Sequence, residues 1–363
     1  MPTSPAARAW SRCLWPAMPR CGSGRISRWR SSAPSSVAEA AVRRRSLIAG
    51  LAFAAPAVAR AQGDWPGSRP VRIIQPSQAG SPADVYARLL AEHFTKAFGG
   101  TFVVENRVGG TGTIGTAAVA QAPPDGWTLM FTSNTSHVVA PLVLRGLSYD
   151  PVRDFVAIAG LYHYPMLLII NPAIPARTTA EFVAWAKARP QGVNMASVGI
   201  GSVGHMMAER FHLRAGFRRE HIPYRGGPSA VLAVSQGESD YIFDNIGNSG
   251  TFMREGRLRG LSATGRSRPR RMPQVPTLAE EGFPGMNEDV WFGLWGAAGL
   301  PRPFVEGVNA EANRWLLSPD IRRRMDEAGH DSLAGPPEAM HGYWMEDRRN
   351  WVEIVRETGV TVE

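Results

Sequence analysis

Short apolar runs alternate with longer amphipathic stretches along most of the chain. The runs are rich in Val, Ile, Leu and Phe and end at small or turn-forming residues, which predicts strands at residues 71–75, 102–106, 127–132, 166–170, 194–198, 221–224, 241–244, 258–263 and 290–297. The amphipathic stretches predict helices at residues 85–98, 116–122, 179–189, 203–215, 229–236, 302–317, 319–328 and 336–357. Strands that alternate with helices indicate an α/β fold with a largely parallel sheet.

The chain beyond its leader is long enough for two lobes, since about 300 residues follow Ala61. The order of the elements fits a chain that crosses to a second lobe near residue 162 and returns near residue 288. We therefore expect one lobe at residues 62–161 plus 289–363 and another at residues 162–288. We expect the C-terminal helices to pack on the first lobe.

The first strand-to-helix corner has the features of a binding site. A strand ends at Pro76, and a helix begins at Ser81-Pro82, where proline suits the first helical position. Ser81 can cap this helix, and Asp84 can accept the Ser81 backbone N–H as in a capping box. The remaining N–H groups of the first turn favour a carboxylate ligand. The alternative is an ordinary turn between strand and helix.

Two later strand ends share this character. Ser133-Asn134-Thr135 and the stretch from Ser197 to Ser202 combine small side chains, hydroxyls and free backbone N–H groups. Because ligands of open α/β sheets bind at the carboxyl ends of strands, the three loops are expected to converge on a cleft between the lobes. The stretch 110–115 matches a dinucleotide fingerprint, but no acidic partner follows at the required distance, so we interpret it as a glycine-lined packing turn.

The net charge of +9 comes from the leader and gives no evidence for nucleic-acid binding. Of the 40 Lys and Arg residues ten lie in residues 1–61, and of the 31 acidic residues one does, so 30 of each sign remain. Both cysteines, Cys13 and Cys21, lie in the leader as well. The body therefore has no thiol for a disulfide, a metal or a nucleophile.

The leader has the pattern of an export signal. Arg43-Arg44-Arg45 precedes an apolar run, and Ala59-Arg60-Ala61 is a small-x-small cleavage signal. The arginines fit the twin-arginine pattern, and a Sec signal is the alternative. The apolar run is short for a membrane span. Residues 1–40 precede any usual signal, and we expect them to be disordered or to reflect an upstream start codon.

Catalytic and metal-binding patterns are weak. The sequence lacks G-x-S-x-G, the P-loop and H-E-x-x-H. His205 and Glu209 lie four residues apart on a predicted helix, which suits a surface pair better than a metal site without a third ligand. The basic stretch 266–271 reads as a solvated loop, with a docking surface for a membrane partner as the alternative. We expect no catalytic residues, metal or cofactor, although His137, His163 and His205 leave an enzyme open.

Several motifs together resemble one family, the periplasmic solute-binding proteins of tripartite tricarboxylate transporters, or Bug-type receptors. The resemblance covers nearly the whole body of the chain. The motifs are Trp65–Ile74, Val103–Arg107 with the following glycines, Pro124–Leu129, Tyr149–Phe155, Ser197–His205, Pro223–Gly227 and Val275–Gly282.

The resemblance implies a two-lobe periplasmic binding protein fold, type II-like, with a ligand cleft between the lobes. It implies that backbone amides, hydroxyls and bridging waters hold a small carboxylate. The matching positions, which we predict to bind the ligand, are Ser77, Gly80, Ser81, Asp84, Ser133, Asn134, Ser197, Gly199, Gly201, Ser202 and Asp244.

Three positions depart from the family pattern. The family usually has an aromatic residue where Ser77 stands, a second glycine where Ser81 stands and an asparagine where Ala140 stands. The missing ring at Ser77 favours a ligand that is bulkier or more polar than an ordinary dicarboxylate.

The sequence thus predicts a periplasmic, monomeric receptor whose partners are a small organic anion and the membrane subunits of a tripartite tricarboxylate transporter. Lobe closure about a hinge would capture the anion. Two alternatives stay open, a secreted two-lobe enzyme and a ligand-binding sensor that is not tied to transport.

Overall fold

The computed structural model describes residues 65–361. The expected export signal, its cleavage signal and both cysteines lie outside the described residues. Residues 62–363 form one compact unit, and the following paragraphs concern this unit.

A six-stranded mixed sheet has the strand order β11-β4-β10-β3-β1-β2. Its strands are β1 (Val71–Gln75), β2 (Phe102–Asn106), β3 (Thr128–Ser133), β4 (Phe155–Pro165), β10 (Asp289–Ala297) and β11 (Asp331–Ser332). β1 pairs in parallel with β2 and β3, whereas β10 runs antiparallel to both β3 and β4. The prediction of a largely parallel sheet is therefore wrong, because β10 runs antiparallel to both of its neighbours and β11 runs antiparallel to β4.

A five-stranded sheet has the order β7-β6-β8-β5-β9. Its strands are β5 (Leu167–Ile170), β6 (Val193–Ser197), β7 (Arg219–Pro223), β8 (Tyr241–Asp244) and β9 (Arg259–Ala263). β6 is parallel to β7 and β8, and β5 is antiparallel to β8 and β9. All five strands fall within the expected second lobe. β4 runs through the expected crossing at residue 162, so the lobe boundaries stay a prediction.

Eight of the α-helices in the described part of the chain agree closely with the amphipathic pattern. The α-helices are α2 (Pro82–Phe98), α3 (Thr113–Ala120), α4 (Ala140–Val143), α5 (Thr179–Lys187), α6 (Val203–Ala215), α7 (Gly227–Gln236), α8 (Ile246–Arg254), α9 (Arg302–Leu317), α10 (Pro319–Ala328) and α11 (Pro337–Thr358), with a 3-10 turn at Gly110–Gly112 and a π-helix at Thr135–Val139. Of these, α4 and α8 were not predicted. Local capping explains the starts of several helices. Thr178 and Glu181 form a complete capping box on α5, and Ser81 caps α2 by accepting the Asp84 N–H.

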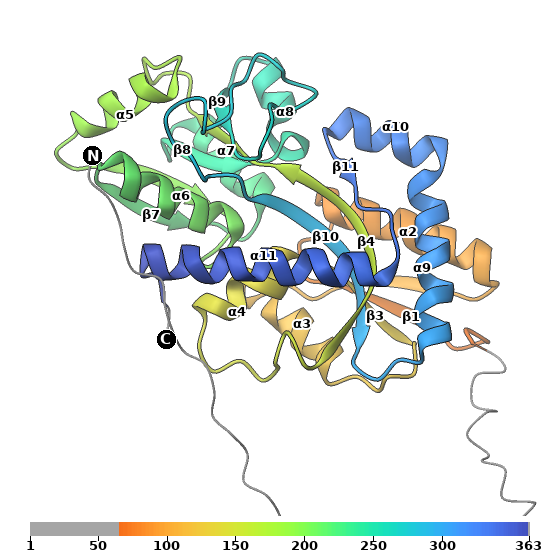
Figure 1. Cartoon of the computed structure of the whole chain (residues 1–363). Helices are drawn as coiled ribbons and strands as arrows, with labels where there is room; N and C mark the ends of the chain where they lie inside the picture. Colours follow the sequence, from red (N-terminus) through yellow and green to blue (C-terminus); the bar gives the residue numbers. More distant parts are fainter. Residues whose placement is uncertain (1–64, 362–363) are drawn as a thin grey trace, which may run out of the picture. The chain divides into compact units, whose positions relative to one another are not determined.

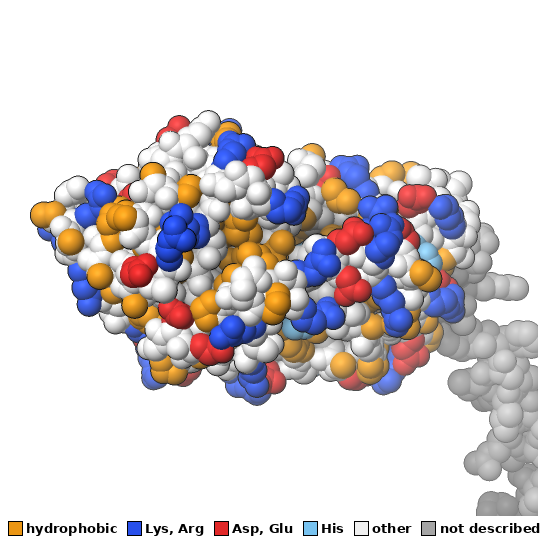
Figure 2. Space-filling view, turned by 90° about the horizontal axis from the view of Figure 1, so that it is seen from above, with side chains coloured by type: hydrophobic (Ala, Val, Ile, Leu, Met, Phe, Trp, Pro, Cys, Tyr) orange, Lys and Arg blue, Asp and Glu red, His pale blue; other side chains and the backbone are white. Residues whose placement is uncertain are grey.

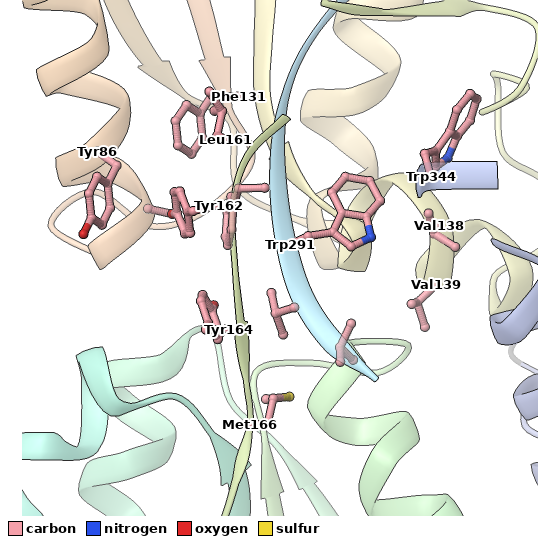
Figure 3. Packing of buried hydrophobic residues seen from close by; sticks show 14 of the residues in the cluster. Tyr86, Phe131, Val138, Val139, Leu161, Tyr162, Tyr164, Met166, Trp291 and Trp344 are labelled. Atoms are coloured by element: carbon pink, nitrogen blue, oxygen red, sulfur yellow. The ribbon is translucent and has the colours of Figure 1, made fainter. Parts of the chain in front are cut away.

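Two long strands connect the two sheets. β4 and β10 pair antiparallel along most of their length and run from the six-stranded sheet toward the five-stranded one (Figure 1). Figure 3 shows Tyr162 and Tyr164 on one side of this strand pair, and Trp291 and Trp344 on the other. All four side chains are buried, so the apolar core continues across the strand pair.

The C-terminal helices contact more of the molecule than was predicted. α9 and α11 contact β4, as expected for packing on the first half of the fold, but α11 also contacts α6. Glu357 near the end of α11 forms ion pairs with Arg210 and Arg214 of α6. α11 therefore connects β4 of the six-stranded sheet with α6, the helix that follows β6 of the five-stranded sheet.

The surface of the body carries charges of both signs. On the face drawn in Figure 2, Lys and Arg side chains are interspersed with Asp and Glu side chains. This agrees with the balance of charges after residue 61. Within the described residues, no helix has both the length and the apolar character needed to cross a membrane.

Candidate functional site

A cavity of about 580 Å³ lies where the two sheets meet, and its walls come from both of them. The loops that follow β1, β2 and β3 contribute one side, and those that follow β6, β7 and β8 contribute the other. Side chains of β4 and β10 complete the lining with Tyr162, Tyr164, Val290 and Phe292. The carboxyl ends of six strands therefore converge on one space, as expected for ligand sites in open α/β sheets.

Four helices begin at this cavity. The first turns of α2, α6, α7 and α8 contribute lining residues, which include Ala83, Gly204, Pro228 and Asn248. The N-terminal ends of helices carry partial positive charge and free backbone N–H groups. The cavity is therefore suited to an anionic group.

The first predicted loop contributes two serines to the cavity. Ser77 and Ser81 line it, and their hydroxyl oxygens lie 3.0 Å apart. The Ser77 hydroxyl also donates to Gln75 Oε1 over 2.8 Å. Gly80 is not part of the lining.

Asp84 lies behind this loop. Its carboxylate accepts the Gly80 N–H, Arg88 Nε and Asn106 Nδ2, each over 2.9 Å. The predicted bond to the Ser81 N–H is wrong, because Ser81 N–H donates to the Gln78 carbonyl instead. Burial alone would raise the pKa of Asp84, but the bonds from Arg88, Gly80 and Asn106 lower it. Asp84 thus shapes the loop as a buried anion.

The other predicted loops also contain both residues that line the cavity and buried residues that do not. Ser133, Gly199 and Asp244 line the cavity. Asn134 is buried and donates to the Asp289 carbonyl oxygen over 2.9 Å. Ser197 is buried, with its hydroxyl 2.7 Å from His221 Nε2.

The last two predicted positions, Gly201 and Ser202, directly precede α6. Ser202 caps this helix, and Gly201 packs against α4, where an added Cβ would lie 3.5 Å from Ala140 Cα. Six predicted residues therefore lie outside the lining, and their part in binding stays a prediction. These six are Gly80, Asp84, Asn134, Ser197, Gly201 and Ser202.

The family model for tripartite tricarboxylate transporter family receptors, TctC, matches residues 86–360. The chain belongs to this receptor family. It is similar to the protein BugT of Bordetella pertussis, with 31% identity over 87% of this chain and 96% of that one. It is equally similar to a UPF0065 protein of Pseudomonas sp. strain P51, with 31% identity over 86% of this chain and 94% of that one.

Solved structures give the same result for the fold. A protein of R. palustris with adipate matches with a TM-score of 0.78 and 28% identity, over 82% of this chain and 99% of that chain. MatC of Rhodopseudomonas palustris with bound malate matches with a TM-score of 0.74 and 30% identity, over 79% and 99% of the two chains. This member of the TctC receptor family thus has the two-lobe fold of periplasmic binding proteins.

The glycine-rich loop of this receptor was not predicted to be part of the site. Gly109, Gly110, Thr111 and Gly112 line the cavity, although we interpreted the stretch 110–115 as a packing turn. Thr111 has a φ of 53°, an unusual value for a β-branched residue. The glycine pattern itself was the available signal, because such runs let the backbone approach a ligand closely.

A group of stacked rings in the cavity wall was not predicted either. The His330 ring lies 4.8 Å from that of Tyr162 and 4.7 Å from that of Tyr164, and Phe292 stacks on Tyr162 at 4.9 Å between centroids. Burial lowers the pKa of His330 to about 3 and raises the pKa of both tyrosines. The ring group is therefore electrically neutral at pH 7.

The three histidines on which the alternative of an enzymatic function rests lie outside the cavity lining. His137 is buried between Trp295 and Trp344, and burial lowers its pKa to about 3. His163 Nδ1 lies 2.8 Å from Asp289 Oδ2.

The expected surface pair of His205 and Glu209 is wrong, because both side chains are buried. Glu209 contacts His205 and His212 at 3.3 Å and also binds Arg219. Among the described residues no group of three or more His, Cys, Asp or Glu side chains is placed to hold a metal ion.

Proposed function

We propose that this protein is an extracytoplasmic solute receptor that binds a small organic anion in the cavity. The observation that carries the proposal is the convergence of six strand ends and four helix N-termini on one space of about 580 Å³. Two similar solved structures contain adipate and malate, which are carboxylates. The bound anion would pass to the membrane subunits of a tripartite tricarboxylate transporter, in keeping with the family description.

In this proposal neutral groups and helix ends recognise the anion. Ser77, Ser81 and Ser133 place hydroxyl groups at the cavity, whereas the Gly199 N–H already donates to Ser197 Oγ and the Gly199 carbonyl accepts the Ser202 N–H. Asp84, Asn134, Ser197, Gly201 and Ser202 would position these loops from behind. The lobes would close over the ligand by bending of β4 and β10, the strands that link the two sheets.

The proposed location is the periplasm, reached through the export signal of the leader, with cleavage after Ala61. N-terminal sequencing of the protein from the periplasmic fraction tests this point. A mature protein that begins at Gln62 supports it, and retention of the whole leader in the cytoplasm contradicts it.

A thermal-shift screen tests the binding function. Dicarboxylates, hydroxy acids, amino acids, amides and aromatic carboxylates are added in turn, and a ligand that binds the folded state raises the melting temperature. Each ligand that binds is then incubated with the protein and assayed for products. Steady product formation would show an enzyme and contradict the receptor assignment.

Asp84→Ala tests the position of the site once a ligand is found. The substitution frees the Gly80 N–H and Asn106 Nδ2, so the first loop loosens and affinity is expected to fall about tenfold, or 1.4 kcal/mol. Asp125→Ala is the matched control, because Asp125 also holds a turn by accepting the Trp127 N–H and pairs with Arg69, but outside the cavity lining. Equal affinities of the two variants would show that the site lies elsewhere.

A further inference from the structure

The carboxyl group of Asp244 lacks the partners that a buried charge needs. Asp244 ends β8, lines the cavity and is only 2% exposed. Its Oδ1 accepts Asn248 Nδ2 over 3.1 Å and Asn245 Nδ2 over 3.4 Å. Its Oδ2 has no hydrogen-bond partner among the described residues. A buried carboxylate with one unsatisfied oxygen is costly unless a ligand supplies the partner.

Among the described residues, no cation compensates the charge of Asp244. Tyr164 on β4, Asn245 and Asn248 are neutral, and the His330 ring, which stacks on Tyr164, is neutral as well. Arg225, in the loop after β7, is the one Lys or Arg among the residues that line the cavity, and its side chain is exposed. Accordingly, burial raises the pKa of Asp244 to about 7.

The nature of the ligand follows from these charges, given the proposed receptor function. A second carboxylate placed at Asp244 would meet a like charge whenever Asp244 is ionised, whereas a hydroxyl would satisfy Oδ2 but leave that charge uncompensated. An ammonium group both satisfies Oδ2 and compensates the charge. The four helix N-termini remain available for the carboxylate of the same ligand.

We propose that the cavity selects a carboxylate that also carries a protonated amine, and that the amine pairs with the Asp244 carboxylate. The plain dicarboxylates are then poorer ligands than their amino derivatives. This inference rests on the proposed function, because it assigns the second half of the same site.

Matched ligands test the inference by isothermal titration calorimetry with protein produced from the full chain. Succinate, malate and aspartate form the first set, in which one carbon carries a hydrogen, a hydroxyl group or an ammonium group. Glutarate, 2-hydroxyglutarate and glutamate form the second set, with the same three substituents. The amino member of a set is expected to bind at least tenfold more tightly than the other two. Asp244→Asn is expected to remove this preference, and Asp326→Asn, an exposed change on α10, is expected to keep it.

Proton release gives a second readout. At pH 7 an ammonium ligand must displace the proton from the fraction of Asp244 that is protonated, so binding releases protons. Titrations in buffers of different ionisation enthalpy measure this release. Asp244→Asn is expected to release none, which a merely structural role of Asp244 does not predict.

The outcomes separate the two proposals. Equal or tighter binding of the plain or hydroxy member contradicts the ammonium inference and leaves the receptor function standing. An amino preference that persists in Asp244→Asn contradicts the assignment to Asp244. If no carboxylate from either set or from the wider screen binds, the receptor proposal fails and this inference fails with it.

Discussion

The hydroxyl of Thr111 donates a 2.6 Å hydrogen bond to the carbonyl oxygen of Ile200. The bond joins the glycine-rich loop after β2 to the loop after β6, which belong to different sheets. A second bond of this kind runs from the Val203 N–H to Thr135 Oγ1 over 3.3 Å. Both bonds lie at the cavity wall, so they connect its two sides directly.

Thr111→Ala should weaken ligand binding by faster release, because it removes one of these bonds. A neutral hydrogen bond contributes about 1 kcal/mol, which corresponds to roughly fivefold in affinity. Thr111→Ser keeps the hydroxyl and is the control. Stopped-flow measurement of the dissociation rate distinguishes the variants, and equal rates for alanine and serine would show that the bond does not hold the bound state.

Ser77→Phe should reduce the space for the ligand, since Ser77 lines the cavity where related receptors are expected to carry a ring. We expect the affinity for the natural ligand to fall by at least tenfold, about 1.4 kcal/mol, while smaller anions lose less. Ser77→Ala, which adds no volume, should change affinity little. Calorimetry with ligands of increasing length checks the trend, and a uniform loss for all lengths would argue against a role of Ser77 in setting cavity size.

Glu209→Gln should make the protein less stable at neutral pH but less sensitive to acid. Burial alone would raise the pKa of Glu209, but its bonds to His205 and Arg219 lower it to about 2. A lowered pKa stabilises the fold above the unfolded value, 4.5, and this stabilisation is lost as the pH falls toward 2. The loss at pH 7 is expected to be about 2–3 kcal/mol, below the usual range for broken buried pairs because Arg219 is 27% exposed.

Urea unfolding at pH 7 and pH 3 measures this difference. Glu220→Gln, on the exposed face of β7, is the control and should behave like the wild-type protein. An equal stability loss for Glu209→Gln at both pH values would contradict the charge-based explanation.

Asp347→Asn should gain stability relative to the wild type as the pH rises. Burial raises the pKa of Asp347 to about 7, although bonds from Trp291 Nε1 and Asn134 oppose this. The folded state therefore keeps its proton above the unfolded pKa of 3.8, and stability is lost as the pH rises to about 7.

From pH 5 to pH 8 the free-energy difference between variant and wild type should shift by about 3 kcal/mol in favour of the variant. Parallel urea titrations at the two pH values measure the shift. The buried histidines are common to both proteins and cancel in the comparison. A constant difference would mean that Asp347 is ionised throughout this range.

The local pattern predicted those strands and helices in which the spacing of apolar residues stays the same from end to end. β1 and β2 match their predicted ranges, as do α9 and α10. β4 was not predicted at all, because Gly160 in its middle interrupts the apolar run. α8 was missed since Gly247 and Gly250 lower its helix propensity.

The sequence predicted the site residues that lie at strand ends. It did not predict those whose position depends on which strands pair with each other. Ser77, Ser133, Gly199 and Asp244 each follow or end a parallel strand, and the order of residues reveals this. Phe292 and His330 reach the cavity from distant parts of the chain. Their positions require the pairing of β10 with β4 and of β11 with β4, and no local signal indicates either pairing.

The five-stranded sheet comes from one uninterrupted stretch of chain, and its two connections to the rest are neighbours, because Pro165 pairs with Asp289. Segments with adjacent ends tolerate exchange between homologues, since the host chain need not move to accept them. Grafting residues 166–288 from another member of the family would replace the loops after β6, β7 and β8 together. Such a chimaera would combine the six-stranded sheet of one receptor with the cavity loops of another. Its ligand preference would then depend in part on the receptor that supplied those loops.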